Sequence, residues 1–385
     1  MDFALNEEQE MIRDLARKFA REVIVPNAAE FDAKAEFPKD IVSQARELGL
    51  MNVSVPAEFG GTGGSVLDLI LVAEQLGWGC SGIALAILLN NLAADPINIA
   101  ANDEQRKKYF GKLAEGFGAY ALTEPSAGSD AGAIRTRAEK HGKEWAISGQ
   151  KIWISNADVA EFFVVFAKTD PEARTHGITA FLVGRDTKGL TVGKPLPKMG
   201  QKASHACEIF LEEAVVSDTQ RLGAENEGFK IAMRVFDRSR PMVGAMATGL
   251  SQRALDEAVS YATEREAFGK PIIEQQGVGF KIAEMGMRTE AARLLVREAA
   301  WRKDRGLDNT LYSSYAKAFC SDTGMWAATE CAQILGGYGY SKEYPAEKLM
   351  RDAKVMQIYE GTNEIQRVVM SRRLAQNAGR GDGGR

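Results

Sequence analysis

A block of strand-like sequence lies between two long helical regions, and this order most constrains the fold of the chain. After Gly116, short runs rich in β-branched and aromatic residues replace the helical pattern, separated by Gly, Asn, Asp and Pro. The runs cover residues 145–148, 152–155, 162–166, 178–183 and 208–211. Such runs are typical of antiparallel strands joined by turns. No helical span alternates with them, so a Rossmann-type parallel sheet is disfavoured.

Helical periodicity dominates both flanks of this block. Apolar residues recur at helical spacing from Asn6 to about Val25, and Pro26 is expected to end that helix. Further helix is expected to about Leu113, and the pattern returns at Gly228 and persists almost to the C-terminus. We therefore predict a mainly α protein with a central β-domain. The expected segments are a helical domain 1–117, a β-domain 118–227, a helical bundle 228–378 and a polar tail 379–385.

The composition is that of a globular protein rather than a nucleic-acid binder or a metalloprotein. The 385 residues are 45% hydrophobic and 26% charged, with a formal net charge of −4. This mildly acidic balance argues against general nucleic-acid binding. The four cysteines lack the CxxC spacing of a zinc site or a disulfide framework, and the three histidines form no ligand cluster. Buried free thiols and no metal are therefore expected.

The sequence predicts neither a membrane span nor a secretory signal. Met1-Asp2-Phe3 runs directly into an acidic helix start, without the apolar stretch of a signal peptide. The longest apolar run, residues 82–89, is too short to cross a bilayer. A cytoplasmic protein without membrane insertion is expected, in a reducing compartment.

A carboxylate on a glycine-containing turn is the most informative candidate for chemistry. Glu360 precedes Gly361 in the segment 359–364, Tyr-Glu-Gly-Thr-Asn-Glu, between two helical patterns. A glutamate there can reach into a cavity, while backbone N–H groups of the turn face a ligand carbonyl. Abstraction of a proton next to a carbonyl needs a base and fixed donors for the oxyanion that develops. Glu-Gly-Thr is also a common helix connection, so the interpretation depends on a redox partner elsewhere in the chain.

Two segments of the β-rich block offer residues suited to a planar cofactor. Residues 120–130 break at Pro125 into a turn rich in hydroxyls and small residues, which can offer N–H groups to a phosphate or a heteroaromatic edge. Trp153 and Ser155 place an aromatic plane and a hydroxyl on one strand face. A tricyclic cofactor could stack on Trp153 and accept a hydrogen bond from Ser155. Core packing is the alternative for Trp153.

Taken in order, these segments resemble those of the acyl-CoA dehydrogenase family, and the resemblance spans almost the whole chain. The matching motifs are Thr-Glu-Pro-Ser-Ala-Gly-Ser-Asp at 123–130, Gly-Gln-Lys-Ile-Trp-Ile-Ser-Asn at 149–156, Arg-Glu-Ala-Phe-Gly-Lys at 265–270, Gln-Ile-Leu-Gly-Gly-Tyr-Gly-Tyr at 333–340 and Tyr-Glu-Gly-Thr-Asn-Glu-Ile-Gln-Arg at 359–367. The implied fold is an N-terminal helical domain, a central antiparallel β-barrel and a C-terminal four-helix bundle. This fold agrees with the order of helical and strand-like segments.

The resemblance implies non-covalently bound FAD in a homotetramer, a dimer of dimers. Residues implied to contact the flavin and its pyrophosphate are Tyr120, Leu122, Thr123, Gly128, Ser129, Trp153, Ile154, Ser155, Thr362 and Glu364. Residues implied to reach the ADP part, largely across a dimer interface, are Arg265, Phe268, Gln276, Gln333, Gly336 and Gly337. A solvated or interface role is the alternative for each Arg or Gln taken alone.

The resemblance also implies an acyl-CoA substrate and assigns the base. Glu360 is the implied catalytic base, whereas some relatives carry the base at the position of Ser239, whose hydroxyl cannot serve as a base at neutral pH. The implied substrate-side residues are Ser129, Asp237, Arg240, Tyr359 and Gly361. A surface ion pair is the alternative for Asp237 and Arg240. The apolar residues 87–89, in a region that closes the acyl pocket in relatives, favour an unfunctionalised acyl tail.

The implied reaction is α,β-dehydrogenation of the thioester to the 2-enoyl-CoA, with flavin N5 as hydride acceptor and an electron-transferring flavoprotein as partner. Three alternatives stay open: an acyl-CoA oxidase, a dehydrogenase or eliminase for a cyclic or substituted acyl-CoA, and a catalytically silent helical interaction protein. Burial of Glu360 beside an acyl chain should raise its pKa, since desolvation penalises the carboxylate. One departure is Lys202, where the family usually has arginine, because lysine lacks the bidentate fork.

Overall fold

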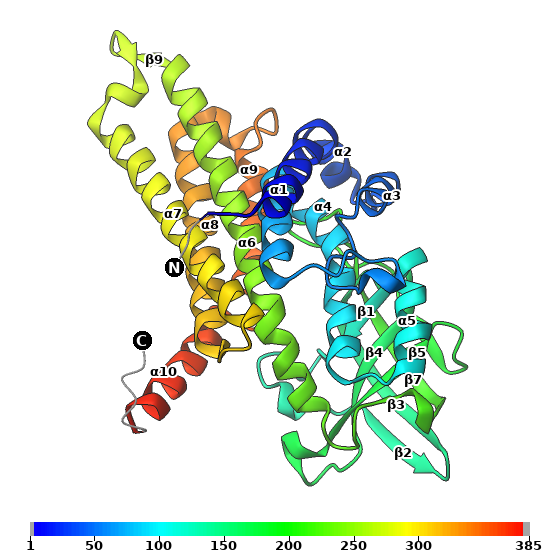
Figure 1. The fold of residues 1–385 in the computed structure, drawn as a ribbon. Coiled ribbons are helices and arrows are strands. Elements are labelled where there is room, and N and C mark those ends of the chain that lie inside the picture. The colour runs from blue at the N-terminus through cyan, green and yellow to red at the C-terminus, as the bar shows by residue number, and fades with distance from the viewer. Residues whose placement is uncertain (1–3, 380–385) are drawn as a thin grey trace.

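The structure, a computed structural model, describes residues 4–379 and places the strands between two groups of helices (Figure 1). The N-terminal helices are α1 (Glu7–Phe19), α2 (Val25–Lys34), α3 (Lys39–Glu47), α4 (Val66–Ala100) and α5 (Asp103–Glu115). The C-terminal helices are α6 (Gly228–Glu264), α7 (Gln276–Asp304), α8 (Thr310–Leu335), α9 (Ala346–Met356) and α10 (Asn363–Gly379). The predicted order of helices, strands and helices is confirmed. The expected tail lies outside the described residues apart from position 379, which ends α10.

The first helix continues past Pro26, so the helix end predicted there is wrong. α1 passes through one turn of π-helix, Ala20–Ile24, directly into α2, and Pro26 occupies the first turn of α2. Proline has no N–H to donate, but the N–H groups in the first turn of a helix need no partner within that helix. The wider π-turn therefore accommodates the proline without ending the helical path.

Helix α4 forms the centre of the hydrophobic core. It is apolar on nearly all sides and bends at Cys80, whose backbone leaves helical geometry with φ −167° and ψ 116°. Its length and hydropathy would suffice for a membrane span, but 89% of its most apolar stretch is buried inside the protein. Such burial is typical of a core helix.

Helices α4 and α6 cross at short range because glycine stands at two points of their contact. A Cβ on Gly77 would lie 2.7 Å from the carbonyl oxygen of Met246, and a Cβ on Gly249 would lie 2.0 Å from the carbonyl oxygen of Glu74. Neither position accepts a larger residue without a shift of the helices, since interiors are close-packed. This crossing joins the N-terminal helices to the C-terminal bundle.

The central strands form one eight-stranded sheet within the described residues. Its strands are β1 (Phe117–Ala121), β2 (Arg137–His141), β3 (Glu144–Ser155), β4 (Ala160–Lys168), β5 (Ile178–Gly184), β6 (Leu190–Val192), β7 (Ala206–Ser217) and β8 (Arg221–Leu222). Their order is β6-β7-β3-β2-β4-β5-β8, and β1 pairs with β4. Most pairs are antiparallel as predicted, but β1 and β2 run parallel to β4. The runs predicted at 145–148 and 152–155 are one strand, β3, which pairs with β7 through two bulges.

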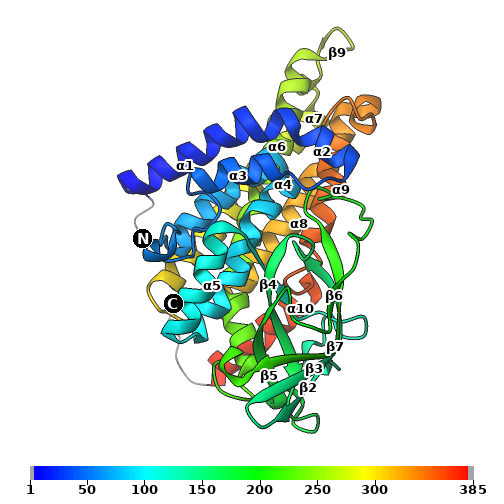
Figure 2. The same ribbon diagram turned by 90° about the vertical axis from the view of Figure 1, so that its right-hand side faces the viewer.

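The C-terminal helices form an elongated bundle with a protruding hairpin at one end (Figure 1, Figure 2). The hairpin consists of β9 (Glu266–Ala267) and β10 (Lys270–Pro271), between α6 and α7. The sheet and α10 lie towards the opposite end of the molecule. Tyr261 packs against Tyr338 and Tyr344 with ring centroids 6.2 and 5.8 Å away. The segment that follows α8 therefore lies next to the end of α6 that leads into the hairpin.

Candidate active site

Glu360 lies on a short turn between α9 and α10, in a backbone conformation that few residues adopt. Glu360 has φ 56° and Gly361 has φ 88°, so two successive residues occupy the left-handed region. This conformation is strained for a glutamate. Gln366 is fully buried and donates from Nε2 to the carbonyl oxygens of Glu360 (3.1 Å) and Gly361 (3.0 Å). The first turn of α10 therefore stabilises the strained turn.

The carboxyl group of Glu360 is partly buried and accepts a hydrogen bond from α6. The hydroxyl of Ser239, itself buried, donates to Oε2 of Glu360 at 2.6 Å. Burial raises the pKa of Glu360, while the Ser239 bond and the positive charges of Arg240 and Lys317 act against that rise. A carboxylate with a raised pKa is a better base near neutral pH than an exposed glutamate.

Arg240 is buried next to Glu360 and Asp237 is half-buried next to Arg240, so a fully exposed ion pair is excluded. Arg240 is 5% exposed, and its guanidinium lies over the ring of Phe236, 5.4 Å from the centroid. Its Nη1 lies 3.9 Å from Oδ1 of Asp237, and its Nε lies 3.5 Å from the carbonyl oxygen of Glu360. Burial raises the pKa of Asp237, which accepts a 2.9 Å hydrogen bond from Thr310. Of these two residues, Arg240 contacts the Glu360 turn directly and Asp237 is linked to that turn through Arg240.

The two segments of the β-domain predicted to contact a flavin are joined by hydrogen bonds. The N–H of Ile152 donates to the carbonyl oxygen of Thr123 at 3.0 Å. Lys151 is fully buried, and its Nζ donates to the carbonyl oxygen of Leu122 (3.0 Å) and to the carboxylate of Glu124 (2.7 Å). Burial lowers the pKa of Lys151 to about 8, against the attraction of Glu124. This buried pair fixes the turn after β1 against the end of β3.

The surface beside this contact is suited to a planar ring. Trp153 is 54% exposed, with φ 62°, so core packing of its side chain is excluded. The hydroxyl of Tyr120 is buried and has no hydrogen-bond partner among the described residues. Gly128 has open space where a Cβ would stand. An exposed aromatic plane, an unpaired hydroxyl and an open turn fit the isoalloxazine ring and pyrophosphate expected here.

The other predicted residues of this region differ in exposure. The Ile154 side chain packs in the core of the sheet, so only its backbone is available to a ligand. Ser129 is exposed, and Ser155 is half-buried at the end of β3. Thr362 precedes α10 and accepts a 3.3 Å hydrogen bond from the N–H of Ile365, while Glu364 is exposed.

A second group of predicted cofactor residues lies at the hairpin end of the bundle. The group consists of Arg265, Phe268, Gln276, Gln333, Gly336 and Gly337. All six are exposed, and Phe268 is 95% exposed. The hairpin end lies away from the sheet that carries Trp153 (Figure 1). A single chain therefore does not bring the two groups of predicted cofactor residues together.

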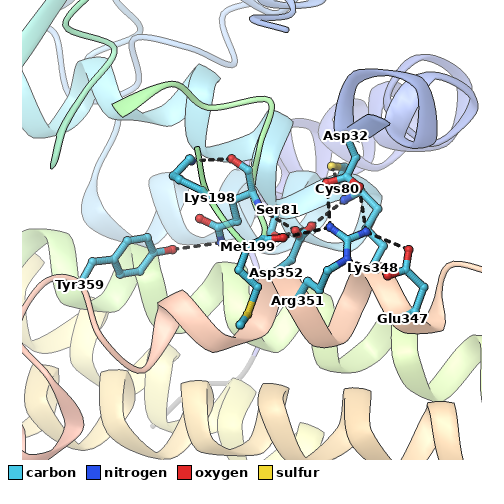
Figure 3. A network of polar contacts seen from close by, with 11 residues as sticks. Asp32, Cys80, Ser81, Lys198, Met199, Glu347, Lys348, Arg351, Asp352 and Tyr359 are labelled. Carbon is cyan, nitrogen blue, oxygen red and sulfur yellow. Dashed lines mark hydrogen bonds and ion pairs between the residues drawn. The ribbon is translucent and has the colours of Figure 1, made fainter. Parts of the chain in front are cut away.

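A polar network connects the Glu360 turn to α9 and to the loop that follows β6 (Figure 3). The hydroxyl of Tyr359 accepts a 3.4 Å hydrogen bond from Nε2 of Gln201, and the N–H of Gln201 donates to Asp352 at 2.5 Å. Asp352 is buried and also binds Lys348 at 2.5 Å. Burial raises the pKa of Tyr359. Through Gln201 the network ties the side chain of Tyr359, the residue before Glu360, to Asp352 of α9.

Sequence reasoning missed two buried charged residues near Glu360. Asp95 of α4 is 1% exposed and accepts a 2.7 Å hydrogen bond from Arg238. Lys317 of α8 is fully buried and donates to Asn363 at 2.8 Å. Each is a single charged residue within a stretch of mainly apolar or small residues. That pattern could have indicated both as buried, paired charges, because a buried charge usually has a partner.

Comparison with known proteins identifies the family. Models of the acyl-CoA dehydrogenase N-terminal, middle and C-terminal domains match residues 6–117, 119–214 and 226–375. A probable medium-chain specific acyl-CoA dehydrogenase 2, mitochondrial, of Caenorhabditis briggsae is 44% identical over 379 residues, which cover 97% of this chain and 92% of that protein. Butyryl-CoA dehydrogenase from Megasphaera elsdenii has a structure similar to this one, with a TM-score of 0.94, 40% identity and coverage of 97% and 100% of the two chains. A chain solved in work on the electron transferring flavoprotein of Acidaminococcus fermentans gives a TM-score of 0.94 and 41% identity, with coverage of 97% and 99%. The chain therefore belongs to the acyl-CoA dehydrogenase family of FAD-dependent oxidoreductases.

Proposed function

We propose that the protein removes hydrogen from Cα and Cβ of an acyl-CoA thioester and forms the 2-enoyl-CoA, with Glu360 as the base for the α-proton. The observation that carries this proposal is the carboxylate of Glu360 on a left-handed turn, bonded to Ser239 at 2.6 Å. Burial raises its pKa, as a base for a weakly acidic C–H bond requires. The dehydrogenases named above support the same class of reaction.

Glu360 offers both groups that proton abstraction next to a thioester carbonyl requires. Its carboxylate is the base, and the Ser239 bond to Oε2 leaves Oε1 to take the proton. Its backbone N–H donates to no backbone or side-chain acceptor within residues 4–379, so it can donate to the substrate carbonyl. A fixed donor at a developing oxyanion contributes on the order of 3 kcal/mol to stabilisation of the transition state.

The β-domain residues are proposed to position the redox cofactor on the side of the substrate opposite Glu360. Trp153 would pack on the isoalloxazine ring, and Leu122, Thr123 and Ser155 would contact its edge. When bound, FAD supplies the acceptor for the two electrons and the β-hydrogen. The buried pair of Lys151 and Glu124 orders the two segments before any ligand arrives, which lowers the entropy cost of binding.

The acyl group that we favour is an unfunctionalised chain. Ile87, Leu88 and Leu89 on α4 are at most 7% exposed, so the region expected to close the acyl pocket is apolar. An apolar wall rejects a carboxylate, since burial of an unpaired charge is costly. Asp237 and Arg240 are proposed to contact the CoA part of the substrate, together with Ser129.

We also propose a homotetramer and an electron-transferring flavoprotein as the redox partner. Phe280, Met287 and Leu294 form an apolar stripe along α7 at seven-residue intervals and are 48–68% exposed. A stripe of this kind is typical of a helix that packs against another subunit. The separation of the two groups of cofactor residues supports the same assembly. The similarity to the chain from the Acidaminococcus fermentans work supports the partner.

Anaerobic titration with a panel of acyl-CoAs tests the proposed function. We expect straight-chain acyl-CoAs to bleach the visible flavin band and to yield the 2-enoyl-CoA. Bleaching by cyclic or substituted thioesters alone would assign the protein to a dehydrogenase or eliminase for those substrates. Rapid reoxidation by oxygen with release of peroxide would assign an oxidase. A purified protein that binds no flavin would support a catalytically silent interaction protein.

A further inference from the structure

Lys317, in the middle of α8, is a buried charged group that the proposed reaction does not use. Its side chain is fully buried, yet among the described residues its ammonium group donates only to Oδ1 of Asn363, at 2.8 Å. An ammonium group has three hydrogens to donate, and its burial is costly unless it is paired. Two of the three ammonium hydrogens therefore have no acceptor among the described residues.

Asn363 connects Lys317 to the catalytic turn. It is the first residue of α10, and its backbone N–H donates to the carbonyl oxygen of Gln357 at 3.0 Å, which closes the turn that contains Glu360. Its side-chain Nδ2 donates to Oδ1 of Asp322 at 2.7 Å, and Nε2 of Gln357 donates to the same oxygen at 2.7 Å. Residues on both sides of Glu360 are therefore bound to one segment of α8.

The charges around Lys317 make Glu360 its principal electrostatic partner. The charged groups that face Lys317 are Glu360 of the turn, Arg240 of α6, Asp322 of α8 and Glu364 of α10. Asp322 already pairs with Arg367 at 2.9 Å, and Glu364 is exposed to solvent. Burial lowers the pKa of Lys317 to about 7, and the attraction of Glu360 is the largest influence against that shift.

We propose that Lys317 is a positioning residue for the reaction: through Asn363 it fixes the turn that carries Glu360, and its positive charge contributes, with that of Arg240, to the pH range in which Glu360 accepts a proton. The inference rests on the proposed role of Glu360 as the base. A nearby positive charge stabilises a carboxylate, so loss of the charge on Lys317 raises the pKa of Glu360. The acid limb of the kcat profile then moves to higher pH, because the base is protonated at a higher pH.

Two substitutions separate the charge of Lys317 from its hydrogen bond. Lys317→Gln keeps a donor for Asn363 but removes the charge, and Lys317→Met removes both at similar length. The kcat of the holoenzyme is measured against pH for each variant, with Tm and flavin content recorded. We expect both variants to shift the acid limb upward by about one pH unit, the lower end of the effect of one nearby charge. Lys317→Met should also lower kcat on the alkaline plateau, because the turn loses its contact through Asn363.

A readout without turnover accompanies the kinetics. The carboxyl stretch of Glu360 in infrared difference spectra, assigned with Glu360→Gln, should titrate at higher pH in both variants. An unshifted acid limb in folded Lys317→Gln would overturn the charge role, and a normal plateau in Lys317→Met would overturn the positioning role. If neither variant folds, Lys317→Arg is measured, which retains the positive charge. An acid limb of its kcat profile that lies at a different pH from that of the wild type contradicts the inference. Failure of the base assignment is recognised separately, because Glu360→Gln would then remain active.

Discussion

The hydroxyl of Ser239 donates a 2.6 Å hydrogen bond to Oε2 of Glu360, although the two residues are 121 positions apart in the chain. The bond brings α6 into direct contact with the turn between α9 and α10. It stabilises the carboxylate form and so opposes the rise in pKa that burial causes. Ser239 occupies the position at which some relatives are expected to carry their base. Here its hydroxyl donates to the carboxylate of Glu360, the proposed base on the other segment.

Ser239→Ala should move the acid limb of the kcat profile to higher pH. The change removes a hydrogen bond to the carboxylate, so the pKa of Glu360 rises and activity at acidic pH falls while the alkaline plateau persists. Ser314→Ala is the matched control, since Ser314 is equally buried but bonds to the carbonyl oxygen of Thr310. An acid limb at the wild-type pH in Ser239→Ala would show that the bond has no influence on the base.

Lys151→Met should destabilise the protein by about 3–5 kcal/mol, because it leaves the carboxylate of Glu124 buried without its ionic partner. Urea denaturation at neutral pH measures the free energy of unfolding. The double variant Lys151→Met with Glu124→Leu should recover much of the loss, since it removes both charges. A single variant as stable as the wild type would mean that the pair does not fix the two segments together.

Trp153→Ala should weaken flavin binding with little effect on the stability of the apoprotein. The side chain is 54% exposed, so its removal leaves no cavity in the core. Loss of a stacked aromatic plane should raise the Kd for FAD by about tenfold, a cost of about 1.4 kcal/mol. Fluorescence titration of the apoprotein with FAD measures this Kd. Unchanged affinity would exclude contact between Trp153 and the ring.

Gly249→Ala should destabilise the fold by about 1–3 kcal/mol, the usual cost of overpacking. The added Cβ would lie 2.0 Å from the carbonyl oxygen of Glu74, so α4 and α6 must move apart. Gly286→Ala in α7 is the control, because its Cβ would lie 3.9 Å from Leu255 and alanine favours the helix. Thermal denaturation should show a lower Tm for the first variant only. Equal Tm values would mean that the crossing tolerates a wider spacing.

Local patterns were sufficient to predict the order of elements and the position of Glu360. The return of helical periodicity at Gly228 coincides with the start of α6, and all four cysteines are free and buried as predicted. These features depend on residues close together in sequence. Pro26 misled the prediction because its effect depends on the π-turn before it, which no local pattern indicates. Strand β3 was divided in two because its bulges resemble turns in sequence.

The contacts that tune the site could not be predicted from the sequence. Lys317 reaches Asn363 across 46 positions, and Asp95 meets Arg238 across 143. Such pairs form only when α4, α6, α8 and α10 pack together. The pKa values of these residues depend on how deeply they are buried, which the composition does not reveal. The hairpin group was predicted by resemblance alone. The same resemblance places the group across a dimer interface, and its distance from the sheet that carries Trp153 is compatible with that expectation.

Turnover of Glu360→Gln tests the central claim most directly. The amide has the size of the carboxylate but cannot take a proton, so kcat should fall by at least about 1000-fold while FAD stays bound. Glu343→Gln, at an exposed position before α9, is the control and should keep wild-type activity. Flavin content and the rate of flavin reduction by acyl-CoA are measured together. A Glu360→Gln variant that binds FAD and reduces it at a rate near that of the wild type would contradict the account.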